Sequence, residues 1–328
     1  MTHIDQDFPP DFSNLNGQEW LHALRDVGQL RGFSEILGSR HEAICVEGGE
    51  TLLVSFETIG AVETLSGTRS PIGWDLAQSN GWTSLTLLSH GDTWFRDETV
   101  YAFFDRLLDE CFFDGFESVI FCGAGPCGYA AAAYCVCSPG ARVLLFHPQA
   151  TLDPRVTDWD DRFTEERRRD FTTRFGFAPD MIDAAARAHV IYDPRERLDA
   201  MHSALFERAN VRRFRAPFMS GGLYSHFRAL DLVAPLLEAV ADDELDTARF
   251  AELYRARRMY GAYLRRLLVQ LDHDRRPGLT RLLCRYASLQ LNAPRFKRRL
   301  AAMEEADAKA AQEKETTEQA QALPESPV

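Results

Sequence analysis

The chain alternates between short apolar stretches and longer stretches in which apolar residues recur at helical spacing. The apolar stretches are rich in Val, Ile, Leu and Phe and are predicted to be strands, at 83–88, 118–122, 142–147, 188–192 and 211–215. The segments between them are predicted to be helices, at 98–113, 128–136, 165–175, 195–209 and 225–241. Strands that alternate with helices in this way build a mostly parallel sheet with helices on both faces, which is an α/β fold.

The N-terminal part of the chain has a different pattern. Residues 1–42 are predicted to be a lead-in with one short helix, at 18–29. The apolar stretches 43–46 and 51–57 flank a Glu-Gly-Gly-Glu turn, which predicts a β-hairpin. The α/β domain is therefore expected to span residues 43–245.

The C-terminal part is predicted to be a helical appendage. Two amphipathic stretches, 247–271 and 279–291, are separated by Arg-Pro-Gly, so we expect a helical hairpin over residues 246–300. This hairpin is basic, because the segment 249–299 carries fourteen Arg or Lys against three acids. Residues 301–328 are polar and are expected to form a disordered tail, although the Ala-, Glu- and Lys-rich segment 294–314 is also suited to extending a helix.

Charge and hydropathy exclude some classes of protein. The net charge of −12 argues against general binding of nucleic acid. The basic helices carry tyrosines at 254, 260, 263 and 286, and we expect them to dock on the acidic body of this chain or of another copy. An external anionic polymer or a membrane surface is the alternative. No run of eighteen apolar residues occurs, and the first ten residues are polar, so we expect no membrane span and a cytoplasmic location.

The seven cysteines are expected to be reduced thiols that serve mainly in packing. Their number is odd, and none has the paired spacing with histidine that a metal site needs. Asp199 and His202 are three residues apart on a predicted helix and are expected to be a surface pair, since no third ligand accompanies them. We expect no metal and no cofactor.

The most informative segment is Ser118–Ala133, in which an apolar strand runs through a turn of small residues into an alanine-rich helix. Such a strand-turn-helix elbow forces its central residue into a strained backbone conformation, and its neighbours must be small. The turn reads Gly123-Ala124-Gly125-Pro126-Cys127-Gly128-Tyr129. It resembles the Gly-Ser-Ser-Met-Gly-Gly-Tyr elbow of a bacterial α/β-hydrolase family with esterase-like and glycan-associated acyltransferase-like members. The resemblance places Gly125 where that family carries its nucleophilic serine.

The resemblance extends downstream and implies further site residues. The segment 143–154 looks like the family's strand ending in a Ser-Pro-Gln loop, with His147 in the place of the serine. Asp193 matches the acid-bearing loop and His226 the histidine-bearing loop, in the chain order that the fold requires. Asp193 is equally suited to capping the helix that follows it. The loop formed by Ser89, His90, Gly91 and Asp92 is expected to line the same pocket and to contribute half of an oxyanion hole.

Glycine at the apex has no nucleophile, so serine-hydrolase chemistry is not expected. The leading hypothesis is a pseudo-hydrolase that binds a small molecule, a glycan or a protein partner in the old pocket, with Gly123, Ala124, Gly125, Pro126 and His147 at the binding site. One alternative is an active acyl-transfer or hydrolytic enzyme that uses Cys127 with His226 and Asp193, because a helix N-terminus lowers the pKa of a thiol. Packing is the competing role for Cys127.

Two other hypotheses about function remain. Chains similar to this one as a whole are sometimes named phosphoadenosine phosphosulfate reductases. Such reductases carry a Ser-Gly-Gly-Lys-Asp-Ser loop and a C-terminal Glu-Cys-Gly-x-His segment, and neither string occurs here. The other reading is an interaction scaffold in which the basic C-terminal helices are the working surface and join copies of the chain into a homo-oligomer.

Overall fold

The computed structural model describes residues 8–219, 221–291 and 293–321. The chain divides into two compact units, Met1–Tyr254 and Arg255–Val328. The division falls after α11 (Thr247–Leu253), later than the sequence predicted, because Phe250 and Tyr254 stack on rings of the first unit.

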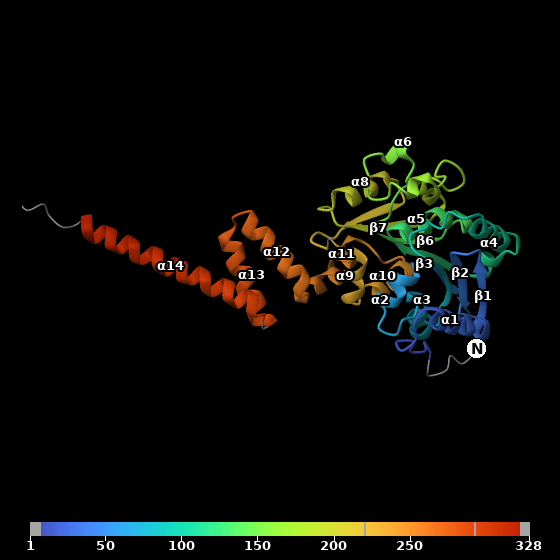
Figure 1. Ribbon diagram of the computed structural model, residues 1–328, viewed down its shortest axis with the longest axis horizontal. Coiled ribbons are helices and arrows are strands. Elements are labelled where there is room, and N and C mark those ends of the chain that lie inside the picture. Colours follow the sequence, from blue (N-terminus) through green and yellow to red (C-terminus); the bar gives the residue numbers. More distant parts are fainter. Residues whose placement is uncertain (1–7, 220, 292, 322–328) are drawn as a thin grey trace, which may run out of the picture. The chain divides into compact units, whose positions relative to one another are not determined.

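The first unit contains an eight-stranded sheet with the order β1-β2-β4-β3-β5-β6-β7-β8 (Figure 1). β2 runs antiparallel to both its neighbours, and the other neighbouring pairs are parallel. The strands are β1 Gly32–Leu37, β2 His41–Val46, β3 Thr51–Thr58, β4 Thr83–Ser89, β5 Ser118–Ala124, β6 Arg142–Phe146, β7 Arg187–Tyr192 and β8 Val211–Arg215. The mostly parallel sheet predicted from the sequence is confirmed.

Helices cover both faces of this sheet (Figure 1). Side chains of β2 alternate between the faces: Ala43 and Cys45 pack in one core cluster, and Ile44 and Val46 pack in another. The first cluster includes α4 and α5, and the second includes α1 and α3. The helices of this unit besides α11 are α1 Gly17–Arg31, α2 Ile59–Leu65, α3 Ile72–Asn80, α4 Glu98–Asp109, α5 Pro126–Tyr134, α6 Pro154–Thr157, α7 Ala178–Met181, α8 Arg197–Leu205, α9 Leu223–Ala229 and α10 Val233–Ala241.

The hairpin predicted between residues 43–46 and 51–57 is wrong, because these two strands do not pair. β2 forms the hairpin with β1, inside the predicted lead-in, and its other edge pairs with β4. β3 lies between β4 and β5 and does not touch β2 in the sheet. The Glu-Gly-Gly-Glu turn therefore carries the chain across the sheet rather than back along the same strand.

Two helical predictions also need correction. The segment 165–175 contains only a 3₁₀ turn at Glu166–Arg168, and its arginines instead hold loops together. The segment 225–241 is two helices, α9 and α10, interrupted where Asp231 adopts a positive φ of 52°.

The second unit is helical and has a core of its own. Its helices are α12 Gly261–His273, α13 Pro277–Gln290 and α14 Pro294–Gln321. Buried side chains of all three helices meet in one cluster, which contains Leu264, Leu268, Leu283, Cys284, Ala287 and Phe296. α14 includes the segment 294–314 that is suited to a helix and continues to Gln321, so residues 315–321 are helical rather than disordered; residues 322–328 lie outside the described residues. Within the described part of the chain, no helix is long and apolar enough to cross a membrane.

Candidate functional site

The turn between β5 and α5 has the backbone geometry of a nucleophile elbow. Gly125 stands at its apex with φ 56° and ψ −121°, a conformation that residues with a side chain rarely adopt. Its backbone N–H donates to the carbonyl of Phe146 at 2.9 Å, which ties the apex to the end of β6. The apex position deduced from the sequence is therefore the apex in the structure.

Small residues on either side of the apex let the strand and the helix approach closely. A Cβ at Gly123 would lie 2.2 Å from the carbonyl oxygen of Cys127. A Cβ at Gly128 would lie 3.2 Å from backbone atoms of Gly123 and Pro148. The elbow sequence thus follows from packing as well as from any chemistry.

His147 lies directly over the apex. A Cβ built on Gly125 would be 3.3 Å from Cε1 of the His147 ring and 3.7 Å from its Nδ1. The backbone of His147 has a φ of 40°, and its N–H donates to the carbonyl of Ile191 at 2.8 Å. The imidazole therefore fills the space beside the apex into which a side chain at position 125 would extend.

Position 126, directly after the apex, has no backbone hydrogen-bond donor because it is proline. In α/β-hydrolases the backbone N–H of the residue after the nucleophile donates to the oxyanion. Proline has no N–H, so position 126 cannot make this hydrogen bond. This deficit is visible in the sequence, where Pro126 was predicted as a binding-site residue and its missing N–H was not considered.

A cavity of about 270 Å³ opens beside His147. It is lined by loops that follow β6, β7 and β8, at the carboxyl edge of the sheet, where α/β folds bind ligands. Its lining residues are His147, Arg162, Asp193, Glu196, Asp199, Met219, Gly221, Gly222 and Leu223.

Asp193 holds the cavity wall together. One of its carboxylate oxygens accepts from the backbone N–H of Arg195 at 2.9 Å, and the other accepts from the N–H of Met219 at 2.7 Å. Asp193 therefore joins the loop after β7 to the loop after β8, in addition to lining the cavity. His226 lies on α9 and is not among the described residues that line this cavity.

Arg162 is placed by a buried ionic network. Its guanidinium donates to Asp160 at 2.8 Å and to Asp199 at 2.6 Å. Asp160 also contacts Nε2 of His202 at 2.8 Å, and Nδ1 of His202 accepts from the N–H of Ala150. The predicted surface pair of Asp199 with His202 is therefore wrong, because His202 is buried against Asp160.

The network sets the charges around the cavity. Burial alone would raise the pKa of Asp160, but hydrogen bonds from His202 and Arg162 hold it well below its usual range. Burial lowers the pKa of the His147 imidazole, against the opposing effect of the Asp199 carboxylate. At neutral pH the cavity thus presents a neutral imidazole, one guanidinium and three carboxylates.

Cys127 has the character of a core thiol. It is buried at the second position of α5 and packs in the core cluster on that face. Burial raises its pKa well above the usual value, and the carboxylates of Asp92 and Glu57 add to this effect. The thiolate expected from the helix N-terminus is therefore opposed by the surroundings of the side chain.

The loop after β4 does not reach the cavity. β3 separates β4 from β5 in the sheet, and none of Ser89, His90, Gly91 and Asp92 lines the cavity. The hydroxyl of Ser89 donates to the carbonyl of Gly91, and His90 lies near Glu42. Of the predicted site residues, the cavity lining brings together His147 and Asp193, with Gly125 beneath His147. Gly123, Ala124 and Pro126 shape the turn without lining the cavity.

The described residues include no cluster of three His, Cys, Asp or Glu side chains able to hold a metal ion. Arg162, Glu196 and Asp199 line the cavity but were not assigned to it from the sequence. Arg162 and Glu196 come from loops and Asp199 from α8, and none of the three directly follows a strand, so no local feature of the sequence assigned them to the cavity.

The strand order, the antiparallel β2 and the elbow after β5 together define the α/β-hydrolase fold. No protein-family model and no curated protein sequence matches the chain.

Solved structures show a distant likeness. The capsule O-acetyltransferase of Neisseria meningitidis serogroup A is 11% identical, with 66% of this chain and 99% of that chain covered and a TM-score of 0.38. Est1E from Butyrivibrio proteoclasticus is 15% identical, with 63% and 97% covered and a TM-score of 0.41. EstE1, a thermostable carboxylesterase from a metagenomic library, is 13% identical, with 72% and 97% covered and a TM-score of 0.41. Likeness at this level carries no argument about the reaction of this chain.

Proposed function

We propose that this protein is a pseudo-hydrolase that binds a small, hydroxyl-rich ligand such as a glycan unit beside its elbow, without acyl transfer. The observation that carries the proposal is the dipeptide Gly125-Pro126 at the apex. Glycine offers no oxygen nucleophile, and proline offers no N–H to an oxyanion. Both deficits act on the same step, the formation of a tetrahedral intermediate.

The polar groups of the cavity suit neutral hydroxyls. The carboxylate of Glu196 makes no hydrogen bond or ion pair with another described residue, so it can accept from a ligand. The neutral His147 ring can donate and accept, and Arg162 can donate. An anionic ligand such as phosphoadenosine phosphosulfate is disfavoured, because carboxylates outnumber the single guanidinium.

The catalytic half of the proposal is tested on the purified protein with a serine-reactive fluorophosphonate and short-chain p-nitrophenyl esters. We expect neither labelling nor turnover above the buffer rate. Robust turnover together with a labelled serine would overturn the proposal. If turnover without a labelled serine were abolished by Cys127→Ala, the thiol enzyme would replace it.

The binding half is tested by calorimetry with neutral mono- and disaccharides. We expect Glu196→Ala to weaken binding about tenfold, the usual effect of removing a hydrogen bond to a charged group. Glu207→Ala is the matched control, since Glu207 is an exposed glutamate in the same unit and does not line the cavity. Equal affinity in both variants would remove Glu196, and with it this cavity, from the proposal.

A second role is favoured by an exposed apolar stripe on α13, formed by Leu279, Leu282, Tyr286 and Leu289. These residues follow one another at intervals of three and four, so they share one face of the helix, while Leu283, Cys284 and Ala287 face the core of the unit. Leu289 is the most exposed of these four side chains, at 76%. An exposed face of this kind is typical of an association surface.

We propose that the stripe binds a second copy of this chain. Residues 255–328 carry 15 Lys or Arg and nine Asp or Glu, whereas residues 1–254 carry 22 and 40. The basic unit of one copy is therefore attracted to the acidic unit of another.

Light scattering coupled to size exclusion tests this role. We expect an oligomeric mass for the full chain and a monomeric mass for the double variant Leu282→Glu with Leu289→Glu. Leu30→Glu, on an exposed leucine of α1, should leave the mass unchanged. A monomeric wild-type chain would exclude the role.

A further inference from the structure

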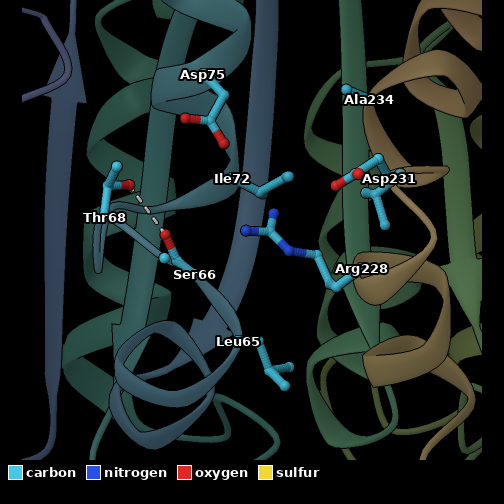
Figure 2. Close-up of a pocket in the computed structure, with 10 residues that line it drawn as sticks. Leu65, Ser66, Thr68, Ile72, Asp75, Arg228, Asp231 and Ala234 are labelled. Atoms are coloured by element: carbon cyan, nitrogen blue, oxygen red, sulfur yellow. Dashed lines mark hydrogen bonds between the residues drawn. The ribbon is translucent and has the colours of Figure 1, made fainter. Parts of the chain in front are cut away.

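A second cavity, of about 290 Å³, lies in the first unit. One wall is formed by the end of α2, the loop after it and α3, and the other wall by the end of α9 and the start of α10 (Figure 2). Its lining residues are Leu65, Ser66, Gly67, Thr68, Ile72, Asp75, Arg228, Asp231, Val233 and Ala234. It shares no lining residue with the cavity beside His147.

The guanidinium of Arg228 reaches into this cavity toward Ile72 and Ser66 (Figure 2). It makes no hydrogen bond and no ion pair with any residue that the structure describes. Arginine presents a planar fork of N–H donors that matches the two oxygens of a carboxylate. Arg228 therefore offers these donors to a ligand.

Carboxylates lie around the same cavity. Asp75 projects from α3, and Asp231 lies on the opposite wall (Figure 2). Glu57 does not line the cavity; it is buried next to Ile72 and already accepts hydrogen bonds from the N–H of Ile72 at 3.1 Å and from the hydroxyl of Ser55. Asp75 and Asp231 thus remain the two carboxylates able to meet a positive group of a ligand.

Positive and negative groups lie side by side in this cavity, which disfavours the binding of a ligand that carries only one kind of charge. A plain anion would bind Arg228 but would be repelled by Asp75 and Asp231, and a plain amine would meet Arg228 as a like charge. A molecule that carries both charges satisfies both sets of groups. Leu65, Ile72, Val233 and Ala234 add an apolar surface to the cavity.

We propose that this cavity binds a small aliphatic α-amino acid, with its carboxylate on Arg228, its ammonium facing Asp75 and Asp231, and its side chain against the apolar wall. The hydroxyls of Ser66 and Thr68, which lie 3.1 Å apart, line the wall toward which the guanidinium points and are the neutral donors for the carboxylate (Figure 2). A volume of about 290 Å³ is at the small end for ligand pockets, which suits a ligand of this size. The site does not depend on the proposed function of the elbow cavity.

Calorimetry of the full chain with L-leucine and L-valine tests the proposal. We expect at least one of the two to bind. Isoamylamine, which lacks the carboxylate of leucine, and 4-methylpentanoate, which lacks its ammonium, should each bind at least about tenfold more weakly. Failure of both amino acids to bind, or equal binding of either analogue, would overturn the proposal.

Variants locate the site. Arg228→Met should weaken binding of the amino acid at least about tenfold, and Asp75→Asn should weaken it in the same direction. Arg197→Met, on an exposed arginine of α8, is the matched control and should bind as the wild type does. Arg228→Lys keeps the positive charge and serves if the methionine variant does not fold; it should lose affinity because it lacks the planar fork. Unchanged affinity in the folded Arg228 variant contradicts the proposal.

Discussion

At the scale of single residues, the elbow differs from the resembled hydrolase elbow at three positions. The apex is glycine, the next residue is proline, and the residue above the apex is histidine where the resembled family has serine. A Cβ at position 125 would lie 3.3 Å from the His147 ring, so the ring would have to shift by a few tenths of an ångström to admit it. Gly125 and His147 are therefore expected to be coupled.

A double-mutant cycle measures this dependence. Gly125→Ala should cost about 1–3 kcal/mol, because the positive φ and the His147 ring both oppose a methyl group. In a His147→Ser background the crowding is removed, and the same substitution should cost at least about 0.5 kcal/mol less. Urea denaturation of the four proteins gives the four free energies. Strict additivity would show that the ring does not restrict position 125.

Histidines buried in the sheet predict a loss of stability in acid. Burial lowers the pKa of His189 to about 4 and that of His41 to about 4. The unfolded chain takes up these protons near pH 6.5, whereas the folded chain does not do so until pH falls toward 4. The stability that these two histidines contribute is therefore fully present above about pH 6.5 and is lost as the pH drops toward 4. Each histidine should contribute a loss of about 1–2 kcal/mol between pH 7 and pH 5.

The variant His189→Phe isolates one of these contributions. Its ring can still stack on Phe214, which lies parallel to His189 with centroids 5.9 Å apart. Urea denaturation at pH 7 and at pH 5 should show a smaller difference than in the wild type. His22→Phe, at an exposed position of α1, should keep the wild-type difference. An unchanged difference in His189→Phe would count against the assignment.

Some site residues could be found from the sequence and others could not. Gly125, His147 and Asp193 each follow a strand end, and parallel strands bring such ends to one edge of the sheet. Arg162 and Glu196 come from irregular loops, and Arg162 is oriented by Asp160 and by Asp199, contacts that no local pattern encodes. Packing of Cys127 was anticipated from the sequence, but the neighbouring carboxylates of Asp92 and Glu57, which add to the rise of its pKa, were not.

At the scale of elements, β5 and α5 are in closer contact than side chains would allow. Gly123 stands where a Cβ would overlap the backbone of Cys127, which cannot move without breaking the helix. By contrast, Gly60 in α2 has no atom within 4 Å of the place its Cβ would take. Close packing therefore requires glycine at position 123 but not at position 60.

Substitution of each glycine by alanine tests this difference. Gly123→Ala should destabilise the chain by about 3 kcal/mol or prevent folding, because the clash is with backbone. Gly60→Ala should be neutral or stabilising by up to about 1 kcal/mol, since it removes freedom from the unfolded chain. Chemical denaturation of both variants provides the comparison. A mild effect at 123 would mean that the strand and the helix can separate.

Most strands were predicted within a residue or two, because their apolar runs are continuous. The pairing of β2 with β4 was not predicted. β3 lies between these two strands in the sequence, and pairing between strands that are not consecutive leaves no local trace. The segment 165–175 combines arginines and aromatic residues in a helix-like rhythm. Contacts such as the hydrogen bonds from Arg167 to backbone carbonyls of Thr157 and Asp158 hold it in a loop instead.

At the scale of the whole molecule, the chain consists of two units with separate cores and charges of opposite sign. The start of the predicted helical hairpin, residues 246–254, is part of the first unit. Phe250 stacks on Phe214 at 4.6 Å, and the hydroxyl of Tyr254 donates to the carbonyl of Pro217. The first unit is thus expected to fold alone only if it keeps α11.

Two truncations test this division. A chain ending at Tyr254 should unfold in a cooperative transition within a few degrees of the main transition of the full protein. A chain ending at Leu245 should melt several degrees lower, because the rings of Phe250 and Tyr254 are lost and their burial is worth about 3 kcal/mol or more. Circular dichroism during heating records both. Equal melting of the two fragments would show that α11 does not belong to the first unit.

The distribution of cysteines has a practical consequence. All seven are free thiols, six of them are buried, and Cys111 alone is exposed among them. A maleimide dye added to the native protein should therefore attach at one position, at the end of α4, without any cysteine being removed by mutation. A single fluorophore at this point could report the rotational diffusion of the first unit and show directly whether the particle becomes larger as its concentration rises.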